Sequence, residues 1–171
     1  MRLLDVLQGK LVIPHMRSRD KWTAIAELVD KLVEEHEIRI FDQREVLEAV
    51  LTREKSRSTG LKHRVALPHG RSRVMDDLIG VLGIAPEGIP FESTDGQDAQ
   101  IICLLVIPEA EYRDHIKTLG DVASRLSDEA FRAAILHAGS NDSPERLLEV
   151  IEAMEGPALV QENPFGDDSE W

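Results

Sequence analysis

The sequence predicts a single α/β domain in which helices flank a central mixed β-sheet. Apolar runs of strand length alternate with amphipathic helical patterns in the middle of the chain, and predicted helices outnumber predicted strands. The 171 residues suffice for one domain with a sizeable core, and no internal repeat or linker divides them. We therefore expect residues 1–155 to form the domain. Residues 156–171 are acidic, punctuated by Pro and Gly and weakly periodic, which is typical of a flexible tail.

Four short segments have the composition of strands. Residues 100–107, QIICLLVI, contain the longest apolar run of the chain and indicate a buried strand. The Pro-, Gly- and Asp-rich residues 86–99 predict a turn-filled connection leading into it. The other three predicted strands cover residues 11–14, 64–67 and 78–85.

Residues 18–36 predict an amphipathic helix that either Ser18 or Asp20 can cap. Its apolar positions recur at spacings of three and four and comprise Trp22, Ile25, Ala26, Val29, Leu32 and Val33. A second helix is predicted over residues 42–53, where the acidic start resembles a capping box. The remaining predicted helices cover residues 109–126, 128–136 with Ser127 as the cap, and 144–154 with Ser143 as the cap and Pro144 at the first position.

Composition excludes several classes of protein. No apolar run approaches the roughly 20 residues that span a bilayer, and the N-terminus does not resemble a signal peptide, so we expect a cytoplasmic protein without direct membrane insertion. The one cysteine, Cys103, lies in an apolar run, which predicts a small buried side chain and excludes a disulfide framework. No P-loop, GxGxxG, HExxH or CxxC motif is present, so neither a cofactor nor a metal is expected.

Charge is distributed unevenly along the chain. The net charge is −12, but residues 53–73 contain seven bases and one acid. The net acidity argues against general nucleic-acid binding through the phosphate backbone. A basic window on an acidic protein instead suggests a small anion such as a phosphate.

At the end of this window, residues 67–73 read LPHGRSR. Proline before His69 fixes the backbone, and Gly70 after it would let a partner approach closely, so we expect a rigid loop that presents the imidazole to solvent. The alternative is that His69 is a structural loop histidine. Phosphoryl transfer suits the pattern, because a neutral imidazole is a nucleophile near pH 7 and arginines stabilise phosphoryl oxygens.

These residues also carry a resemblance. Residues 53–71, REKSRSTGLKHRVALPHGR, resemble the active-site segment of the fructose/mannitol-type EIIA domain of the bacterial phosphotransferase system, most closely its stand-alone, nitrogen-related branch. Residues 87–109 and 115–136 resemble further segments of that family. The resemblance extends over roughly residues 3–154.

The resemblance implies that His69 accepts a phosphoryl group from the histidine of the carrier HPr. It also implies that His115 lies beside His69 and helps to bind the phosphate, and that Arg53 lies near the site. Ser58 and Thr59 would lie on the adjoining loop, where we expect them, like Gly70, to contact the phosphate or a partner. The residues alone leave simpler alternatives open. His115 could be a half-buried structural histidine, Arg53 could complement a helix dipole, and Ser58 and Thr59 could be turn residues.

The chain departs from the family at Lys62 and Arg64, where glycine is common. We expect these cations to bind phosphate or a partner and to influence the choice of phosphoryl donor. Two functions of the phosphorylated protein stay open. The protein could pass the phosphoryl group to a downstream EIIB, or it could be a regulatory module whose binding to a kinase or transporter depends on phosphorylation of His69.

Overall fold

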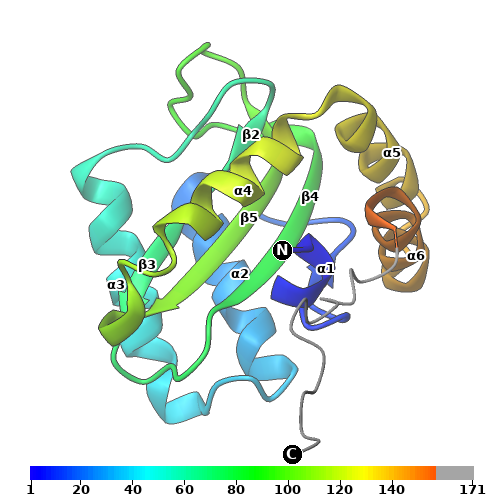
Figure 1. The fold of residues 1–171 in the computed structure, drawn as a ribbon. Coiled ribbons are helices and arrows are strands. Elements are labelled where there is room, and N and C mark those ends of the chain that lie inside the picture. Colours follow the sequence, from blue (N-terminus) through cyan, green and yellow to red (C-terminus); the bar gives the residue numbers. More distant parts are fainter. Residues whose placement is uncertain (157–171) are drawn as a thin grey trace, which may run out of the picture.

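The structure is a computed structural model that describes residues 1–156 (Figure 1). It contains a five-stranded sheet in the order β1-β4-β5-β2, with β3 also paired to β5. Strands β4 and β5 are antiparallel to each other, and every other pair is parallel, so the predicted mixed sheet is confirmed. The strands are β1 (Val12–Ile13), β2 (Val65–Ala66), β3 (His69–Ser72), β4 (Ile79–Ile89) and β5 (Ala99–Pro108).

The helices surround this sheet. Figure 1 shows α4 across the front of the sheet and α2 behind it, with α3 at the edge formed by β3. All five predicted helices are present with shifted ends, and α1 is an addition that the sequence did not suggest. The helices are α1 (Leu3–Val6), α2 (Lys21–Glu34), α3 (Gln43–Ser56), α4 (Ile116–Ser127), α5 (Glu129–Gly139) and α6 (Pro144–Glu155), with short 3-10 turns η1 (Ile40–Asp42) and η2 (Glu109–Glu111). None of these helices of residues 1–156 is long and apolar enough to cross a membrane.

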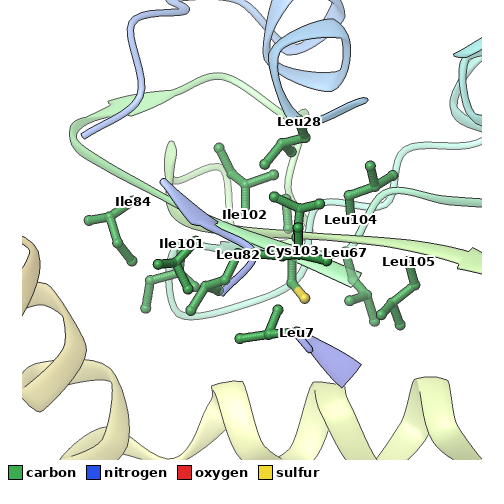
Figure 2. Close-up of a cluster of buried hydrophobic side chains, with 14 of the residues drawn as sticks. Leu7, Leu28, Leu67, Leu82, Ile84, Ile101, Ile102, Cys103, Leu104 and Leu105 are labelled. Atoms are coloured by element: carbon green, nitrogen blue, oxygen red, sulfur yellow. The ribbon is translucent and has the colours of Figure 1, made fainter. Parts of the chain in front are cut away.

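The core fills both faces of the sheet. A Cβ at Gly80 would meet Val6 of α1, whereas one at Gly83 would meet Leu28 of α2, because residues three apart on a strand point to opposite faces. Figure 2 shows Leu28 on one side of β4 and β5 and Leu7 on the other. Cys103 is fully buried there, and burial raises the pKa of its thiol to about 12, so it is the inert apolar side chain that the sequence predicted.

Several helix ends differ from the predictions. Asp20 caps α2, accepting hydrogen bonds from the backbone N–H groups of Trp22 and Thr23 at 3.0 Å. The predicted capping box at Asp42 is wrong, because that side chain makes no cap bond and instead pairs with Arg39 at 3.1 Å. The prediction of Ser127 as the cap of α5 is also wrong. Asp128 accepts from the first turn in its place.

The apolar face of α2 is rotated relative to its prediction. Trp22, predicted on the apolar face, is 40% exposed, whereas Lys21 is buried in the interior. Lys21 can lie there because its ammonium pairs with the carboxylate of Glu54 on α3. The buried core positions of the helix are Ala24, Ile25, Leu28, Val29 and Leu32.

Strands β2 and β3 form one edge strand with an interruption. Val65 pairs with Ile101 and His69 with Leu105, so the register on β5 is the same on both sides of the break. The break falls at Pro68, whose carbonyl still accepts a hydrogen bond from Leu105 at 3.0 Å although it has no N–H to return. The prediction that His69 sits in a loop was therefore wrong, because His69 is the first residue of β3.

Helix α6 ends at Glu155, one residue before the end of the described part, and the domain boundary at residue 155 stays a prediction. The predicted tail, residues 156–171, lies outside the described residues except for Gly156.

Candidate functional site

One ring nitrogen of His69 is hydrogen-bonded to the backbone of a residue two positions earlier in the chain. Its Nδ1 lies 2.9 Å from the carbonyl oxygen of Leu67. A carbonyl can only accept a hydrogen bond, so Nδ1 carries the proton and donates it. In the neutral ring this leaves Nε2 with a free lone pair, which makes Nε2 the nucleophilic atom.

The surroundings of this ring favour its neutral form. Burial lowers the pKa of His69 below its ordinary value, because a charged imidazolium loses solvation there. The hydrogen bond to Leu67 raises the pKa, the positive charge of Arg53 lowers it, Glu54 raises it and Arg71 lowers it. Because the net shift is downward, the ring is neutral and nucleophilic at pH 7.

Next to His69 a cleft of about 580 Å³ opens between α3, β3 and the segment that follows β5. Arg53 reaches it from the last turn of α3, with Nη1 donating to the carbonyl of Arg57 at 2.7 Å. The structure thus brings Arg53 to His69, as the resemblance implied. The lining consists mostly of α3 side chains and the start of β3: Glu45, Glu48, Ala49, Thr52, Arg53, Ser56, His69, Gly70, Arg71 and Tyr112.

Arg71 is the second cation of the cleft. It lies two residues after His69 on β3 and therefore on the same face of the strand. Its guanidinium carbon lies 3.6 Å from the centroid of the Tyr112 ring, and the neighbouring Arg73 pairs with Glu109 at 2.8 Å. These contacts attach the segment after β5 to the edge of the cleft. No motif in the sequence pointed to Tyr112, although it is the only tyrosine of the chain.

His115 lies at the start of α4, and its expected contact with His69 stays a prediction. It precedes α4 and is half-buried, and its Nε2 lies 3.2 Å from Oε2 of Glu111. Among residues 1–156 it does not belong to the lining of the His69 cleft, which Tyr112 borders instead. His115 is thus connected to the cleft through the sequence, because it follows Tyr112 by three residues in the same segment.

The hydroxyl groups of Ser58 and Thr59 are used in hydrogen bonds within the protein, and neither residue lines the cleft. Ser58 Oγ donates to the carbonyl of Phe91. Thr59 is 5% exposed, and its Oγ1 donates to Oε2 of Glu54 at 2.5 Å. Both hydroxyls are thus used to fix the loop between α3 and β2, and their prediction as phosphate ligands is corrected.

The packing of α3 against β3 requires a glycine at position 70, which the sequence did not reveal. A Cβ at this position would lie 2.9 Å from the backbone nitrogen of Val50 and 3.0 Å from the carbonyl carbon of Ala49. The space of the absent side chain is therefore occupied by α3. The glycine lets α3 pack against β3, and because Gly70 also lines the cleft, its contact with a phosphate or a partner stays a prediction.

Lys62 and Arg64 lie at the other end of the edge strand. Val65, next to Arg64, pairs with Ile101, whereas His69 pairs with Leu105 four residues further along β5. At 3.3 Å per residue this separation is about 13 Å. Neither cation lines the cleft, and binding of a phosphate or of a partner protein by Lys62 and Arg64 stays a prediction.

Arg64 has an unusual backbone. Its φ is 61°, following a φ of 67° at His63, both in the left-handed region that favours glycine. Two hydrogen bonds to the Arg64 carbonyl, from Gln100 at 2.8 Å and from Ile101 at 3.1 Å, hold this conformation. A glycine at position 64 would adopt this conformation without steric cost, and this chain places an arginine there under strain.

Comparison with known proteins relates this arrangement to characterised relatives. Residues 5–153 match the family model described as phosphoenolpyruvate-dependent sugar phosphotransferase system, EIIA 2. A nitrogen regulatory protein of Bradyrhizobium diazoefficiens is 32% identical over 129 residues, which cover 75% of this chain and 82% of that protein. The fructose-specific EIIABC component of Bacillus subtilis is 27% identical over 143 residues, which cover 84% of this chain and 22% of that protein.

Solved structures agree with the sequence relatives. The crystal structure of nitrogen regulatory protein IIA-Ntr from Neisseria meningitidis matches with a TM-score of 0.73 and 25% identity, covering 86% of this chain and 97% of that chain. IIA mannitol from Escherichia coli shares the fold, with a TM-score of 0.65 and 24% identity over 82% of this chain and 95% of that chain. The resemblance predicted from the sequence is confirmed, and the chain belongs to the EIIA 2 family of the phosphoenolpyruvate-dependent sugar phosphotransferase system.

Proposed function

We propose that this protein is a phosphohistidine carrier and that His69 is the residue that carries the phosphoryl group. The observation behind the proposal is the bond between Nδ1 of His69 and the Leu67 carbonyl, because it leaves Nε2 unprotonated at the edge of a cleft with two arginines. Membership of the EIIA 2 family supports a role in phosphoryl transfer.

In the proposed step the lone pair of Nε2 attacks the phosphorus of a donor phosphohistidine. The bond from Nε2 to phosphorus forms as the donor's phosphorus–nitrogen bond breaks, and the electron pair of that bond returns to the donor ring. The positive charge that develops on His69 is stabilised by donation from Nδ1 to Leu67. Arg53 and Arg71 stabilise the negative phosphoryl oxygens, since guanidinium groups donate several hydrogen bonds in a plane.

We propose a phosphorylated HPr-type carrier as the donor and EIIB as the acceptor, in the cytoplasm. One structural relative supports the acceptor, because it was solved as a complex of enzyme IIA mannitol with phosphorylated enzyme IIB mannitol. In this step His115 assists from the start of α4. Its ring must then turn from Glu111 toward the phosphoryl group.

A regulatory output is the second candidate, with the same chemistry at His69. It is favoured by the relatives named nitrogen regulatory protein, from Bradyrhizobium diazoefficiens at 32% identity and Escherichia coli at 34%. The fructose-specific component of Bacillus subtilis is less similar, at 27%. Transfer from the phosphorylated protein to EIIB domains separates the outputs. A regulatory protein keeps its label in the presence of every EIIB offered, whereas a transport component loses it.

The phosphorylation site can be tested directly. The protein is incubated with enzyme I, HPr and phosphoenolpyruvate, and the label is located by mass spectrometry and by ³¹P NMR. We expect one phosphoryl group, stable to base and labile to acid, on Nε2 of His69. The variant His69→Ala should remain unlabelled, while the exposed His63→Ala, as the control, should be labelled like the parent. Full labelling of His69→Ala would overturn the assignment.

A further inference from the structure

A buried ion pair lies beneath the His69 site. Lys21 Nζ on α2 is 3.3 Å from Glu54 Oε1 on α3, and their side chains are 8% and 0% exposed. Lysine and glutamate are seldom buried in this way, because their desolvation offsets most of their attraction. A pair of this kind is therefore weak as a source of stability, which raises the question of what else it holds in place.

Glu54 also fixes Thr59, the residue at which the chain turns back after α3. The backbone N–H of Thr59 donates to Oε1 at 3.1 Å, and its hydroxyl donates to Oε2 at 2.5 Å. The carboxylate thus receives hydrogen bonds on both oxygens while Lys21 balances its charge. Thr59 cannot shift or rotate without breaking at least one of these bonds.

Thr59 is connected to the His69 ring by two further hydrogen bonds. Its carbonyl accepts a hydrogen bond from the N–H of Leu67 at 3.1 Å, and the carbonyl of Leu67 accepts from Nδ1 of His69 at 2.9 Å. An antiparallel bridge between Gly60 and Ala66 keeps the two segments side by side. A continuous chain of contacts therefore runs from Lys21 to His69.

We infer that Glu54 is a positioning residue for His69, acting through Thr59 and Leu67 to keep the proton on Nδ1 and the lone pair on Nε2. This inference rests on the proposed function. Arg53 precedes Glu54 on the same helix turn and faces the cleft, while Glu54 faces the interior. The end of α3 thus orients both the nucleophile and one of the cations that meet the phosphoryl group.

The test is the variant Glu54→Gln, which keeps the shape of the side chain and removes its charge. A matched control is Glu155→Gln at the end of α6. The Glu155 side chain is likewise 0% exposed and lies 3.6 Å from Arg125, and it accepts from the N–H groups of Leu3 at 2.6 Å and Leu4 at 2.9 Å. Both variants remove the charge of a buried, ion-paired carboxylate, but only one of these carboxylates is linked to the cleft.

Two quantities are measured at a temperature at which circular dichroism shows both variants folded. The first is the initial rate of phosphorylation by a phosphorylated HPr-type carrier, and the second is the pair of ¹⁵N ring shifts of His69. We expect Glu54→Gln to slow transfer by about 10- to 100-fold, as small misplacements of reacting groups do, and to shift the ring toward a mixture of tautomers. Glu155→Gln should match the parent in both. Parent-like rate and shifts in Glu54→Gln would overturn the inference.

A second pair of variants decides the matter if Glu54→Gln fails to fold. Thr59→Val removes the hydroxyl but leaves the ion pair and the volume intact, and Thr59→Ser restores the hydroxyl. We expect Thr59→Val to slow phosphorylation and to alter the ring shifts of His69. Thr59→Ser should keep both the rate and the shifts of the parent. Identical behaviour of the two would overturn the inference. If the parent itself is not labelled on His69, the proposed function fails instead, while the ring shifts, which need no donor, still test the role of Glu54.

Discussion

The guanidinium group of Arg71 lies over the ring of Tyr112, with 3.6 Å between its central carbon and the ring centroid. The two residues are far apart in sequence, and each contributes to the lining of the His69 cleft. Stacking on an aromatic face restricts the guanidinium without using its N–H groups, which remain free to donate to an anion. In the proposed function, this contact prepares Arg71 for a phosphoryl group.

The first prediction follows from this contact. Replacing Tyr112 by leucine should release Arg71 and slow phosphorylation of His69 by about two- to fivefold, the equivalent of an exposed cation–π contact. Tyr112→Phe keeps the aromatic face and should behave like the parent. Initial rates with a phosphorylated HPr-type carrier provide the measurement, and equal rates for the leucine and phenylalanine variants would show that the stacking has no role in transfer.

The second prediction concerns the titration of His69. In a peptide of residues 66–72 the imidazole should titrate near 6.5, and in the folded protein its pKa should be lower, because burial disfavours the charged ring. NMR titration of the ring protons in the protein and in the peptide makes the comparison. A value in the folded protein at or above that of the peptide would contradict the proposed neutral nucleophile.

The lowered pKa of His69 has a consequence for stability. As the pH falls through 6.5, the unfolded chain takes up a proton on this ring before the folded protein does, so the contribution of the neutral ring to stability is lost below that pH. The variant His69→Gln should lack this component. Urea unfolding of both proteins between pH 5 and pH 8 measures it, and the free energies of unfolding should diverge only toward the acidic end.

The third prediction concerns His115. If its ring donates to the phosphoryl group, His115→Ala should fold normally and slow transfer by about one to three orders of magnitude, as the loss of a preorganised donor does. The ring must leave Glu111 to do this, so Glu111→Gln should not slow transfer. Unchanged rates in His115→Ala would assign His115 a purely structural role at the start of α4.

The fourth prediction concerns the strained position 64. Arg64→Gly should raise the free energy of unfolding by about 1 kcal/mol, because glycine adopts a positive φ without the steric cost of a side chain. Arg64→Ala removes the same charge but keeps the strain, so its stability should stay close to that of the parent. Thermal or urea unfolding of the three proteins tests this prediction. Equal stability of the glycine and alanine variants would contradict it.

The charges at positions 62 and 64 are tested by a kinetic experiment on the double variant to glycine. We expect the rate of phosphoryl exchange with the donor to change at low salt and the difference to shrink as salt is raised, because exposed charges act mainly on encounter. An acidic donor should be captured more slowly by the variant, and a basic donor faster. If exchange equals that of the parent at low salt with every donor, these cations lie outside the docking surface.

Much of this molecule follows from its sequence. The apolar runs and helical spacings predicted the mixed sheet and five of its helices, because these patterns depend on neighbours two to four residues away. The residues around His69 also indicated the chemistry, since proline, histidine and nearby bases in one short segment suit a phosphorylated imidazole. Ser143 as a cap and Pro144 at the first position of α6 were predicted correctly for the same local reason.

The tertiary structure decided what depends on residues far apart in the chain. His69 lies in a strand rather than a loop because β5 offers it hydrogen bonds in parallel register, and Gly70 is needed because α3 packs against it. The hydrogen bond of Thr59 to Glu54 could not be predicted from the sequence, because it depends on a carboxylate that α3 buries beside Lys21 of α2. Sequence patterns report which face of an element is buried, but the pairing of buried polar groups depends on how separate elements pack.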